Sequence, residues 1–374
     1  MASLPLLCTV LLTVVCGLPF VDNISQDLFD RSHSRPLGTG AWSNVVSAVH
    51  IPSGAEVALK TPFNELADTS TELHFLRKLS ECPNIIDLVG LVRENSKCSQ
   101  PILVLEKADC NLREYIRDEK IKNDTEAKMI IYQAAAALKQ MHLYNICHRD
   151  VKPTNLLVFE DHLEVVLSDL GLAEYCDKID RIGRGTLEYF PPEVAKLALN
   201  KNATRDLDFK AVDMYALGIT AYYVITRGKR PFYRHNGTED ADLAFMEELA
   251  NLNQISNWPR VIRNDPAALD LFKGMLASDP GKRLSPQNVL EHPCAAAARS
   301  VQVNVQEEVL QRSQRQKILE SRISVNDNSC LVGFGCQILN TIRRIGSGGA
   351  LNQLLEEAPS EKTPFQSLDT SIFA

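Results

Sequence analysis

The sequence predicts an α+β fold with two lobes: a small strand-rich lobe with one helix, and a larger helical lobe. Short apolar or β-branched runs bounded by Pro, Gly or Ser dominate residues 33–105. One stretch among them carries leucines at helical spacing. From about residue 110 to 297, long apolar helical patterns take over. We therefore expect a cleft between the two parts.

The elements can be assigned in chain order. Strands are predicted at VVSAVHI (45–51), EVALK (56–60) and PILVLE (101–106). A helix is predicted over 69–79, with a Thr or Ser as N-cap, because leucines recur there at helical spacing: Leu73, Leu76 and Leu79. Two long helices, both largely apolar, are predicted at 126–145 and 212–226.

Both ends of the chain differ from this central region. Residues 1–20 are apolar and uncharged, and residues 21–32 are predicted to be a short polar connector. A helical C-terminal extension is predicted over 298–346, and a flexible tail over 347–374. The extension contains a charged helical stretch at 305–322 and an amphipathic one at 336–346. It could pack on the helical lobe, contact a membrane, or be a helical extension with no separate role.

The first 20 residues, MASLPLLCTVLLTVVCGLPF, have the composition of a secretory signal peptide with cleavage near Gly17. A positively charged start is missing apart from the amino terminus itself. An uncleaved membrane anchor stays open, because an apolar run of about 18–20 residues can span a bilayer. A misassigned start or a buried segment stays open too. We expect a protein of the secretory pathway, secreted or membrane-associated, and a cytoplasmic one if this segment is not a signal.

Composition excludes some classes of function. The 374 residues are 45% hydrophobic and 23% charged, which allows a substantial core. The net charge of −7 argues against nucleic acid as the main partner, since binding to its backbone needs a basic face. Ten cysteines are scattered without a C-x-x-C pair, which disfavours zinc and redox motifs. Disulfides and buried free thiols both remain open, and the sequence does not give a pairing.

Two motifs in the small lobe point to phosphate binding. GTGAWSNV (38–45) lies between strand-like runs, and its glycines let backbone amides approach phosphate oxygens. Lys60 ends the apolar strand VALK, and Glu72 lies on the following helix. A carboxylate that holds a lysine ammonium in place improves its contact with phosphate. Either motif alone is common in other settings, but their order along the chain favours a nucleotide site.

The segment HRDVKPTNLL (148–157) decides the chemistry. Phosphoryl transfer to an alcohol needs a carboxylate for the hydroxyl proton, a cation to balance the moving phosphoryl, and an oxygen ligand for Mg²⁺. Asp150, Lys152 and Asn155 supply these three groups within one short loop. Asp169 in SDLGLAE follows the next strand and offers a second metal ligand.

In this order the motifs resemble those of eukaryotic protein kinases of the serine/threonine type, over residues 33–297. The resemblance implies the bilobal kinase fold, with an antiparallel-sheet N-lobe (33–105) and an α-helical C-lobe (110–297). It also implies transfer of phosphate from ATP to serine or threonine of protein substrates, with Mg²⁺, or alternatively Mn²⁺, as the metal.

The resemblance assigns roles to individual residues. Asp150 and Lys152 are the implied catalytic residues, and Asn155 and Asp169 the implied metal ligands. The other implied nucleotide-site residues come from both lobes: Leu37, Gly38, Gly40, Val45, Ala58, Lys60, Glu72, Glu106 and Leu157.

Within that nucleotide set, Ser43 stands where the family usually has its third glycine. Leu105 is the implied gatekeeper, and Glu106 opens the hinge whose backbone meets adenine.

Three further matches are expected to support the fold. Glu193 and Arg283 resemble an ion pair that fixes the activation segment to the C-lobe, and Asp213 resembles the buried aspartate that anchors the catalytic loop. Charges of this kind are costly to bury unpaired.

Several positions depart from the family pattern. Leu170 replaces phenylalanine in the DLG triplet, and we expect it to pack between Leu76 and His148. The triplet at 191–193 is PPE instead of APE. Since Lys60 and Glu72 are only 12 positions apart, the helix with Glu72 is expected to begin late.

The activation segment has no serine or threonine between Leu172 and Gly185. Phosphorylation would ordinarily order such a segment by pairing with Arg149. Only Tyr175 could be modified there, and Asp177 and Asp180 are predicted to be fixed acidic substitutes. We expect activation that does not depend on serine or threonine phosphorylation of this segment. A pseudokinase scaffold and a kinase for non-protein substrates are the alternative functions.

Overall fold

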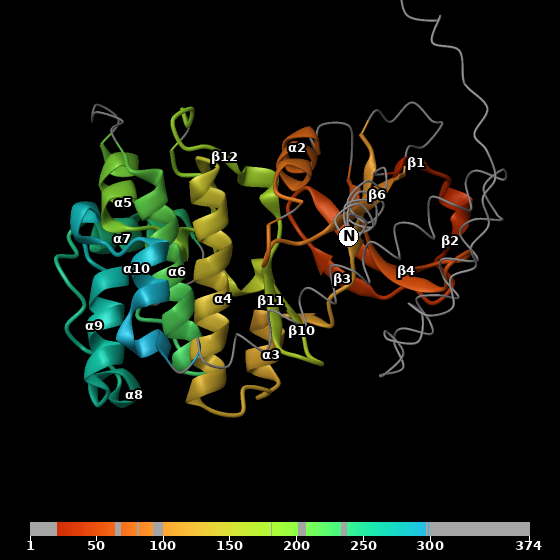
Figure 1. Ribbon diagram of the computed structural model, residues 1–374. Helices are drawn as coiled ribbons and strands as arrows, with labels where there is room; N and C mark the ends of the chain where they lie inside the picture. Colours follow the sequence, from red (N-terminus) through yellow and green to blue (C-terminus); the bar gives the residue numbers. More distant parts are fainter. Residues whose placement is uncertain are drawn as a thin grey trace, which may run out of the picture. The chain divides into compact units, whose positions relative to one another are not determined.

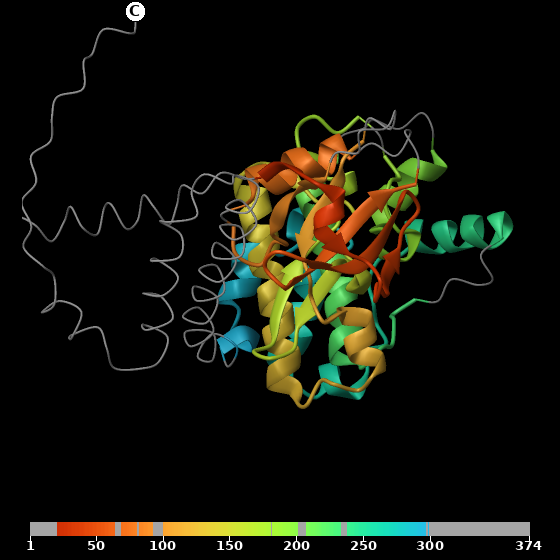
Figure 2. The ribbon, with the colours of Figure 1, turned by 90° about the vertical axis from the view of Figure 1, so that its right-hand side faces the viewer.

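The computed structural model describes residues 21–63, 69–80, 82–92, 100–180, 182–200, 207–232, 238–296 and 298. These residues form the two predicted lobes, so the α+β bilobal fold is confirmed. In Figure 1 the red and orange strands of the N-lobe lie on one side of the long helices α4 and α6, and Figure 2 is turned so that this sheet faces the viewer.

The N-lobe is built on a sheet with the strand order β1-β6-β7-β5-β4-β2, and β3 also pairs with β4. All of its pairs are antiparallel except β1 with β6. The strand bounds are β1 Val21–Ile24, β2 Phe29–Asp30, β3 Pro36–Thr39, β4 Ser43–His50, β5 Ala55–Pro62, β6 Leu88–Val92 and β7 Ile102–Glu106. The three predicted strands correspond to β4, β5 and β7.

Alternation along β5 decides which residues face the C-lobe. Successive side chains of a strand point to opposite faces of its sheet. Val57 and Leu59 are fully buried in an apolar cluster that is confined to the N-lobe. Ala58 lies on the other face and belongs to the main core cluster, which continues through the C-lobe. Lys60, two positions further on, therefore shares the face of Ala58 and is directed toward the second lobe.

Residues 21–32 are not a mere connector, so that prediction is corrected. They contribute β1, β2 and the short 3₁₀ helix η1 (Gln26–Leu28). The physical reason is the outer face of the sheet, whose apolar side chains must be covered. Ile24 and Phe29 supply that cover, with 0% and 6% of their surfaces exposed.

The predicted N-lobe helix is α2, Ser70–Lys78. It starts only two residues before Glu72, so the expected late start is confirmed. Thr69 occupies the N-cap position but makes no capping bond with its side chain. Its hydroxyl donates instead to Gln100 Oε1 at 3.0 Å, which ties the start of the helix to a residue two positions before β7.

The C-lobe consists mainly of helices around α4 and α6. Their bounds are α3 Leu112–Arg117, α4 Asp124–Leu143, α5 Pro192–Leu199, α6 Phe209–Ile225, α7 Glu239–Ala250, α8 Arg260–Arg263, α9 Pro266–Met275 and α10 Pro286–Glu291. The two predicted long helices correspond to α4 and α6. Short 3₁₀ turns lie at η2 Pro153–Asn155, η3 Leu170–Leu172, η4 Leu187–Tyr189, η5 Pro280–Lys282 and η6 Pro293–Ala295.

Two small sheets lie against these helices and carry the functional loops. One has the order β11-β10-β8 and the other pairs β12 with β9. Their bounds are β8 Cys110–Asn111, β9 Ile146–Cys147, β10 Leu156–Phe159, β11 Glu164–Leu167 and β12 Glu174–Tyr175. The loop between β9 and β10 contains the HRD motif, and the turn after β11 contains Asp169.

A buried ion pair fixes the end of the activation segment to the C-lobe, as predicted. Arg283 binds Glu193 through both terminal nitrogens, at 2.6 and 3.1 Å. The same guanidinium donates to the carbonyls of Ala211 and Ala277. Its side chain is 0% exposed, so these partners replace all of its water.

Among the described residues, no helix is both long and apolar enough to cross a membrane. The predictions for residues 1–20, for the extension at 298–346 apart from Ala298, and for the tail at 347–374 lie outside the described residues.

Replacing Arg283 with methionine should destabilise the protein by about 3–5 kcal/mol, because Glu193 loses its counter-charge inside the lobe. The neighbouring Lys282 is a matched control, since its side chain is 79% exposed. Lys282→Met should change the free energy of unfolding by less than about 0.5 kcal/mol. Urea unfolding of both variants measures the difference, and equal midpoints would show that the pair has no structural role.

Candidate active site

A three-membered charge cluster joins the lobes at the predicted nucleotide site. Lys60 Nζ on β5 lies 2.7 Å from Glu72 Oε2 on α2 and 2.8 Å from Asp169 Oδ1 in the turn after β11. The Leu170 backbone N–H also hydrogen-bonds to the Glu72 carboxylate. Strand, helix and C-lobe turn are therefore held together by one ammonium and two carboxylates.

Electrostatics keep Lys60 and Asp169 ionised, whereas burial raises the pKa of Glu72. Burial alone would lower the pKa of Lys60, but the charges of Glu72 and Asp169 outweigh it and raise that pKa above its ordinary value. Burial would likewise raise the pKa of Asp169, but Lys60 overcomes it and lowers that pKa. Both groups are therefore charged at neutral pH.

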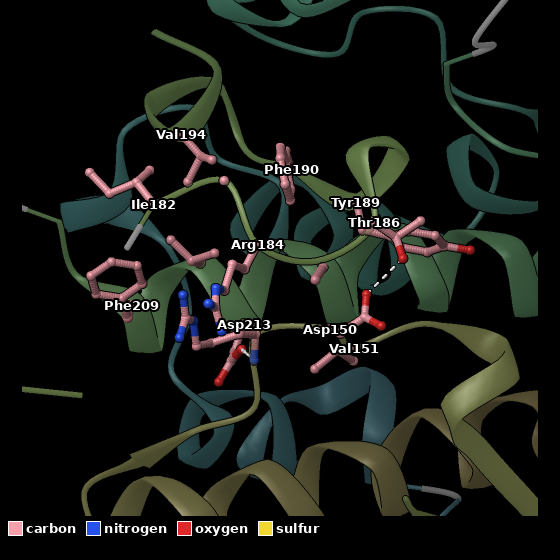
Figure 3. A pocket seen from close by; sticks show the side chains of 14 residues that line it. Asp150, Val151, Ile182, Arg184, Thr186, Tyr189, Phe190, Val194, Phe209 and Asp213 are labelled. Carbon is pink, nitrogen blue, oxygen red and sulfur yellow. Dashed lines mark hydrogen bonds between the residues drawn. The ribbon is translucent and has the colours of Figure 1, made fainter. Parts of the chain in front are cut away.

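The catalytic loop forms a second network around Asp150. Lys152 Nζ donates to Asp150 Oδ2 at 2.6 Å and to Thr186 Oγ1 at 2.8 Å. The Thr186 hydroxyl donates in turn to Asp150 Oδ1 at 2.7 Å, the dashed contact in Figure 3. Asn155 Nδ2 donates to the Asp150 carbonyl at 2.9 Å. The carboxylate of Asp150 is thus oriented from both sides while 9% of its side chain stays exposed.

Asp213 on α6 anchors this loop through its backbone, as predicted. Its two carboxylate oxygens accept the backbone N–H groups of His148 and Arg149, both at 2.8 Å. His142 Nε2 lies 3.0 Å from the same carboxylate. Arg149 has φ 71°, an uncommon conformation for a residue with a side chain, and these bonds hold it there.

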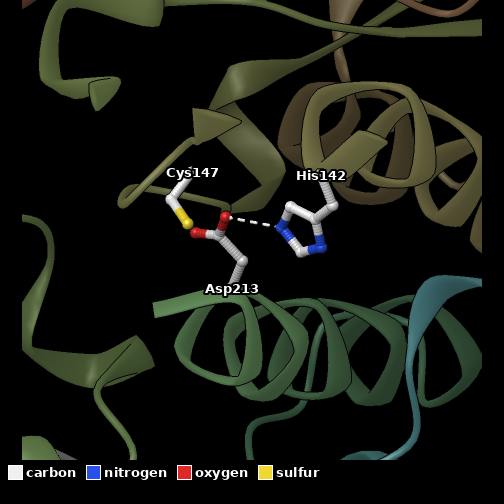
Figure 4. Close-up of side chains that lie close together, drawn as sticks. All are labelled: His142, Cys147 and Asp213. Carbon is white, nitrogen blue, oxygen red and sulfur yellow. Dashed lines mark hydrogen bonds and ion pairs between the residues drawn. The ribbon is translucent and has the colours of Figure 1, made fainter. Parts of the chain in front are cut away.

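Figure 4 shows that the sulfur of Cys147 also lies close to His142 and Asp213. A histidine, a cysteine and a carboxylate are a common set of metal ligands. Here the Cys147 sulfur is bonded to Cys176, so it is not a free thiolate. We therefore interpret this cluster as the anchor of the catalytic loop.

The predicted adenine-side residues converge on the main apolar cluster. Ala58 and the gatekeeper position Leu105 belong to that cluster, and Leu37, Val45 and Leu157 pack against it. They come from five different strands of both lobes. The Glu106 side chain accepts the Asp87 backbone N–H at 3.0 Å and so is occupied within the lobe. The prediction that a ligand at the hinge meets the backbone is compatible with this contact.

The Gly-rich loop connects β3 to β4. Gly38 pairs with Val45, and the Gly40 N–H donates to the Ser43 carbonyl at 2.9 Å, which closes the turn. A Cβ at Gly38 would meet nothing within 4 Å, so the position is open to a ligand. Ser43, at the place of the third glycine, is buried.

The residues at the predicted metal site fit a hard divalent cation. Asn155 uses its amide nitrogen on Asp150, and its amide oxygen accepts no hydrogen bond from the part of the chain that the structure describes. Asp169 uses Oδ1 on Lys60, and within the same described ranges its Oδ2 has no partner. Each residue thus keeps one oxygen for a ligand, the donor type that Mg²⁺ prefers.

Leu170 is buried in the core, as expected for the DLG variant, and the predicted packing with Leu76 is confirmed at the level of a shared cluster. It is 0% exposed and lies in the same core cluster as Leu76. The His148 ring nitrogen Nε2 hydrogen-bonds to the Ser168 carbonyl at 2.9 Å, which holds the backbone just before the triplet.

Arg149 has an acidic partner in the activation segment that the sequence did not predict, Glu174. Arg149 Nη1 lies 2.7 Å from Glu174 Oε2. Asp177 instead accepts a hydrogen bond from Asn145 at 2.8 Å, so its prediction is wrong. Burial lowers the pKa of Arg149, and the charge of Asp180 is among those that raise it. The sequence signal for Glu174 was its place three residues after the DLG triplet.

A pocket extends beneath the activation segment, from Asp150 to the start of α6 (Figure 3). Asp150 and Thr186 line one end. The remaining lining is mostly apolar and includes Ile182, Phe190, Val194 and Phe209. An apolar hollow therefore adjoins the carboxylate at the centre of the site.

Comparison with known proteins identifies the family of the chain. The protein kinase domain model matches residues 31–295. Extracellular signal-regulated kinase 1 of Dictyostelium discoideum is 30% identical over 317 residues, which cover 73% of this chain and 58% of that kinase. Mitogen-activated protein kinase pmk-1 of Caenorhabditis elegans is 30% identical over 297 residues, 70% of this chain and 75% of that protein. Mitogen-activated protein kinase 5 of Arabidopsis thaliana is 28% identical over 319 residues, with coverages of 75% and 82%.

The matched region contains both lobes and every residue of the two networks described above. The chain therefore belongs to the eukaryotic protein kinase superfamily, in its serine/threonine class, and its activity is phosphotransfer to protein.

Proposed function

We propose that the protein transfers the γ-phosphate of ATP to serine and threonine hydroxyls of protein substrates, with Mg²⁺ bound at Asn155 and Asp169. The observation that carries this proposal is the Asp150–Lys152–Thr186 network. A pseudokinase needs none of these contacts, whereas transfer to an alcohol needs a carboxylate and a cation side by side.

Asp150 orients the substrate hydroxyl and accepts its proton. The hydroxyl oxygen then bonds to the γ-phosphorus, the bond from that phosphorus to the bridging oxygen breaks, and ADP leaves. Lys152 lies 2.6 Å from Asp150 and balances the negative charge of the phosphoryl group during transfer. Lys60, held by Glu72, contacts the α- and β-phosphates.

When bound, Mg²⁺ supplies charge neutralisation on the phosphates. Asp169 is suited to hold it, because Lys60 lowers its pKa and keeps its carboxylate ionised. The hydrogen bond from Asn155 Nδ2 to Asp150 fixes which end of the amide is offered to the metal.

Two features support a polypeptide substrate with serine or threonine. Mostly apolar side chains lie beside Asp150, next to the place where the phosphoacceptor would bind. Thr186 joins the activation segment to Lys152 of the catalytic loop. The two residues resemble the threonine and lysine that occur together in serine/threonine kinases.

We further propose that the activation segment works without phosphorylation. Glu174 already neutralises Arg149 with a carboxylate, and Arg149 is buried at its catalytic-loop position. A phosphate placed there would compete with this carboxylate for the same guanidinium.

We also propose that the protein acts on the secretory route, either released or held at a membrane. The uncharged apolar segment 1–20 supports this, and so does the disulfide between Cys147 and Cys176, since such bonds persist in oxidising compartments.

N-terminal sequencing of protein recovered from the secretory fraction should give a sequence that begins after residue 17. A chain that keeps Met1 and stays in the membrane pellet indicates an anchor, and one that keeps Met1 in the cytosol contradicts the proposal.

Asp150→Asn should lower kcat by about 10²–10⁴-fold, because the amide cannot accept the hydroxyl proton. Asp161→Asn is a matched control, since Asp161 is exposed and remote from the network. Incorporation of labelled phosphate from ATP and Mg²⁺ into casein measures both, and Lys60→Ala should also be inactive. Equal incorporation by wild type and by the Asp150 and Lys60 variants would show that these two residues do not act in phosphotransfer.

Tyr175→Phe should keep kcat within about twofold of wild type, because the ring packing of Tyr175 stays and only its hydroxyl bond to His74 is lost. Mass spectrometry of the active wild-type enzyme should find the segment from 172 to 185 unmodified. Treatment with a broad phosphatase should likewise leave the rate unchanged. A strict requirement for phosphate on Tyr175 contradicts the proposal.

A further inference from the structure

We propose that the Cys147–Cys176 disulfide positions the activation segment for phosphotransfer, together with the Arg149–Glu174 ion pair. This inference rests on the proposed kinase function and names a covalent restraint within the same site. In this role Cys147, Cys176 and Glu174 are positioning residues.

The disulfide joins the two segments whose alignment the reaction needs. Cys147 is the last residue of β9 and directly precedes the HRD motif. Cys176 directly follows β12, at a sequence separation of 29 and with 5.3 Å between the Cα atoms. The Cys176 backbone N–H also donates to the Asn145 carbonyl at 2.8 Å. The start of the activation segment is thereby fixed to the strand that leads into the catalytic loop.

The strand pairing at this point is too short to supply that restraint alone. β12 and β9 are two residues each, with Glu174 opposite Cys147 and Tyr175 opposite Ile146. An isolated pair of strands is marginally stable even when it is longer. The covalent bond and the ion pair flank this minimal sheet and keep it closed.

The same restraint reaches the N-lobe through Tyr175. Its ring packs edge-on against Phe75 of α2, with centroids 5.4 Å apart, and its hydroxyl lies 3.2 Å from His74 Nε2. Lys78 Nζ of the same helix lies 5.5 Å from the ring centroid. Because α2 carries Glu72, the segment held by Cys176 also supports the helix that orients Lys60.

Few residues separate the tether from the metal ligand. Asp169 lies seven positions before Cys176, and the intervening turn η3 packs its Leu170 into the core. Asp169 itself has φ 62°, a conformation that needs support from its surroundings. A shift of the segment at 174–176 would therefore displace both Arg149 and Asp169.

The test compares the wild type with Cys147→Ala/Cys176→Ala, which removes the bond without leaving a buried thiol. The kcat/KM for casein should fall about tenfold, since a misplacement of about 1 Å at a reacting centre can cost up to 10²-fold. The KM for ATP should stay within twofold. Trypsin should cut after Lys178 and Arg184 faster than in the wild type, because the freed segment opens more often.

Cys294→Ala is the matched control, since Cys294 is a buried free cysteine near the end of the C-lobe and away from the catalytic loop. It should leave kcat/KM and the tryptic rates unchanged. Non-reducing peptide mapping of the wild type should show the peptides of Cys147 and Cys176 linked, and separate peptides overturn the inference.

Glu174→Gln tests whether the ion pair and the disulfide act on the same segment. Each change alone leaves the other restraint in place, so the combined variant should lose more activity than the product of the two single losses. Simple multiplication of the losses would mean that the two act independently and would contradict joint positioning.

The outcomes separate the inference from the proposed function. A wild type that binds ATP but phosphorylates nothing contradicts the proposed function. The tryptic rates then still show whether the Cys147–Cys176 disulfide restrains the activation segment. A wild type that is active, with a Cys147/Cys176 variant equal to it in kcat/KM and in tryptic rates, defeats the inference alone. A parallel loss of ATP affinity, of activity and of resistance to trypsin along the whole chain indicates a general structural bond and also defeats it.

Discussion

The buried carboxylate of Asp213 fixes the catalytic loop, and the rest of the site is arranged around that loop. It accepts two consecutive backbone N–H groups, from His148 and Arg149, and leaves no freedom in the turn that presents Asp150. Because both oxygens accept from backbone N–H groups, the restraint does not depend on the side-chain rotamers of His148 and Arg149. A carboxylate with 1% exposure would be costly without these bonds, so loop and helix stabilise each other.

The two lobes meet through charge, not through apolar contact alone. Lys60 of the sheet binds Glu72 of α2 and Asp169 of the C-lobe turn with nearly equal distances. Each of these groups lies on a different element, so the cluster forms only when sheet, helix and turn are correctly placed relative to one another. A nucleotide whose phosphates contact the ammonium of Lys60 would thus bind where the lobes are already aligned.

Local patterns predicted the fold class, the major helices and the site residues. Both the periodicity of apolar residues and the catalytic motifs lie within short stretches of sequence. Strands β1 and β2 were missed because their role is to cover the outer face of a sheet formed by distant residues, as the burial of Ile24 shows. The partner of Arg149 was misassigned for the same reason. Whether Glu174 or Asp177 faces the guanidinium depends on the register of β12 against β9, which is a tertiary property.

The disulfide also bears on when the enzyme becomes competent. Cys147 ends β9 and Cys176 follows β12, and their Cα atoms lie 5.3 Å apart where these two strands pair. A restraint of this kind is acquired once, as the newly made chain matures, and does not have to be renewed by an upstream kinase. On our proposal that this bond positions the activation segment, folding and activation become one event, and the amount of active enzyme follows directly from the amount of correctly matured chain.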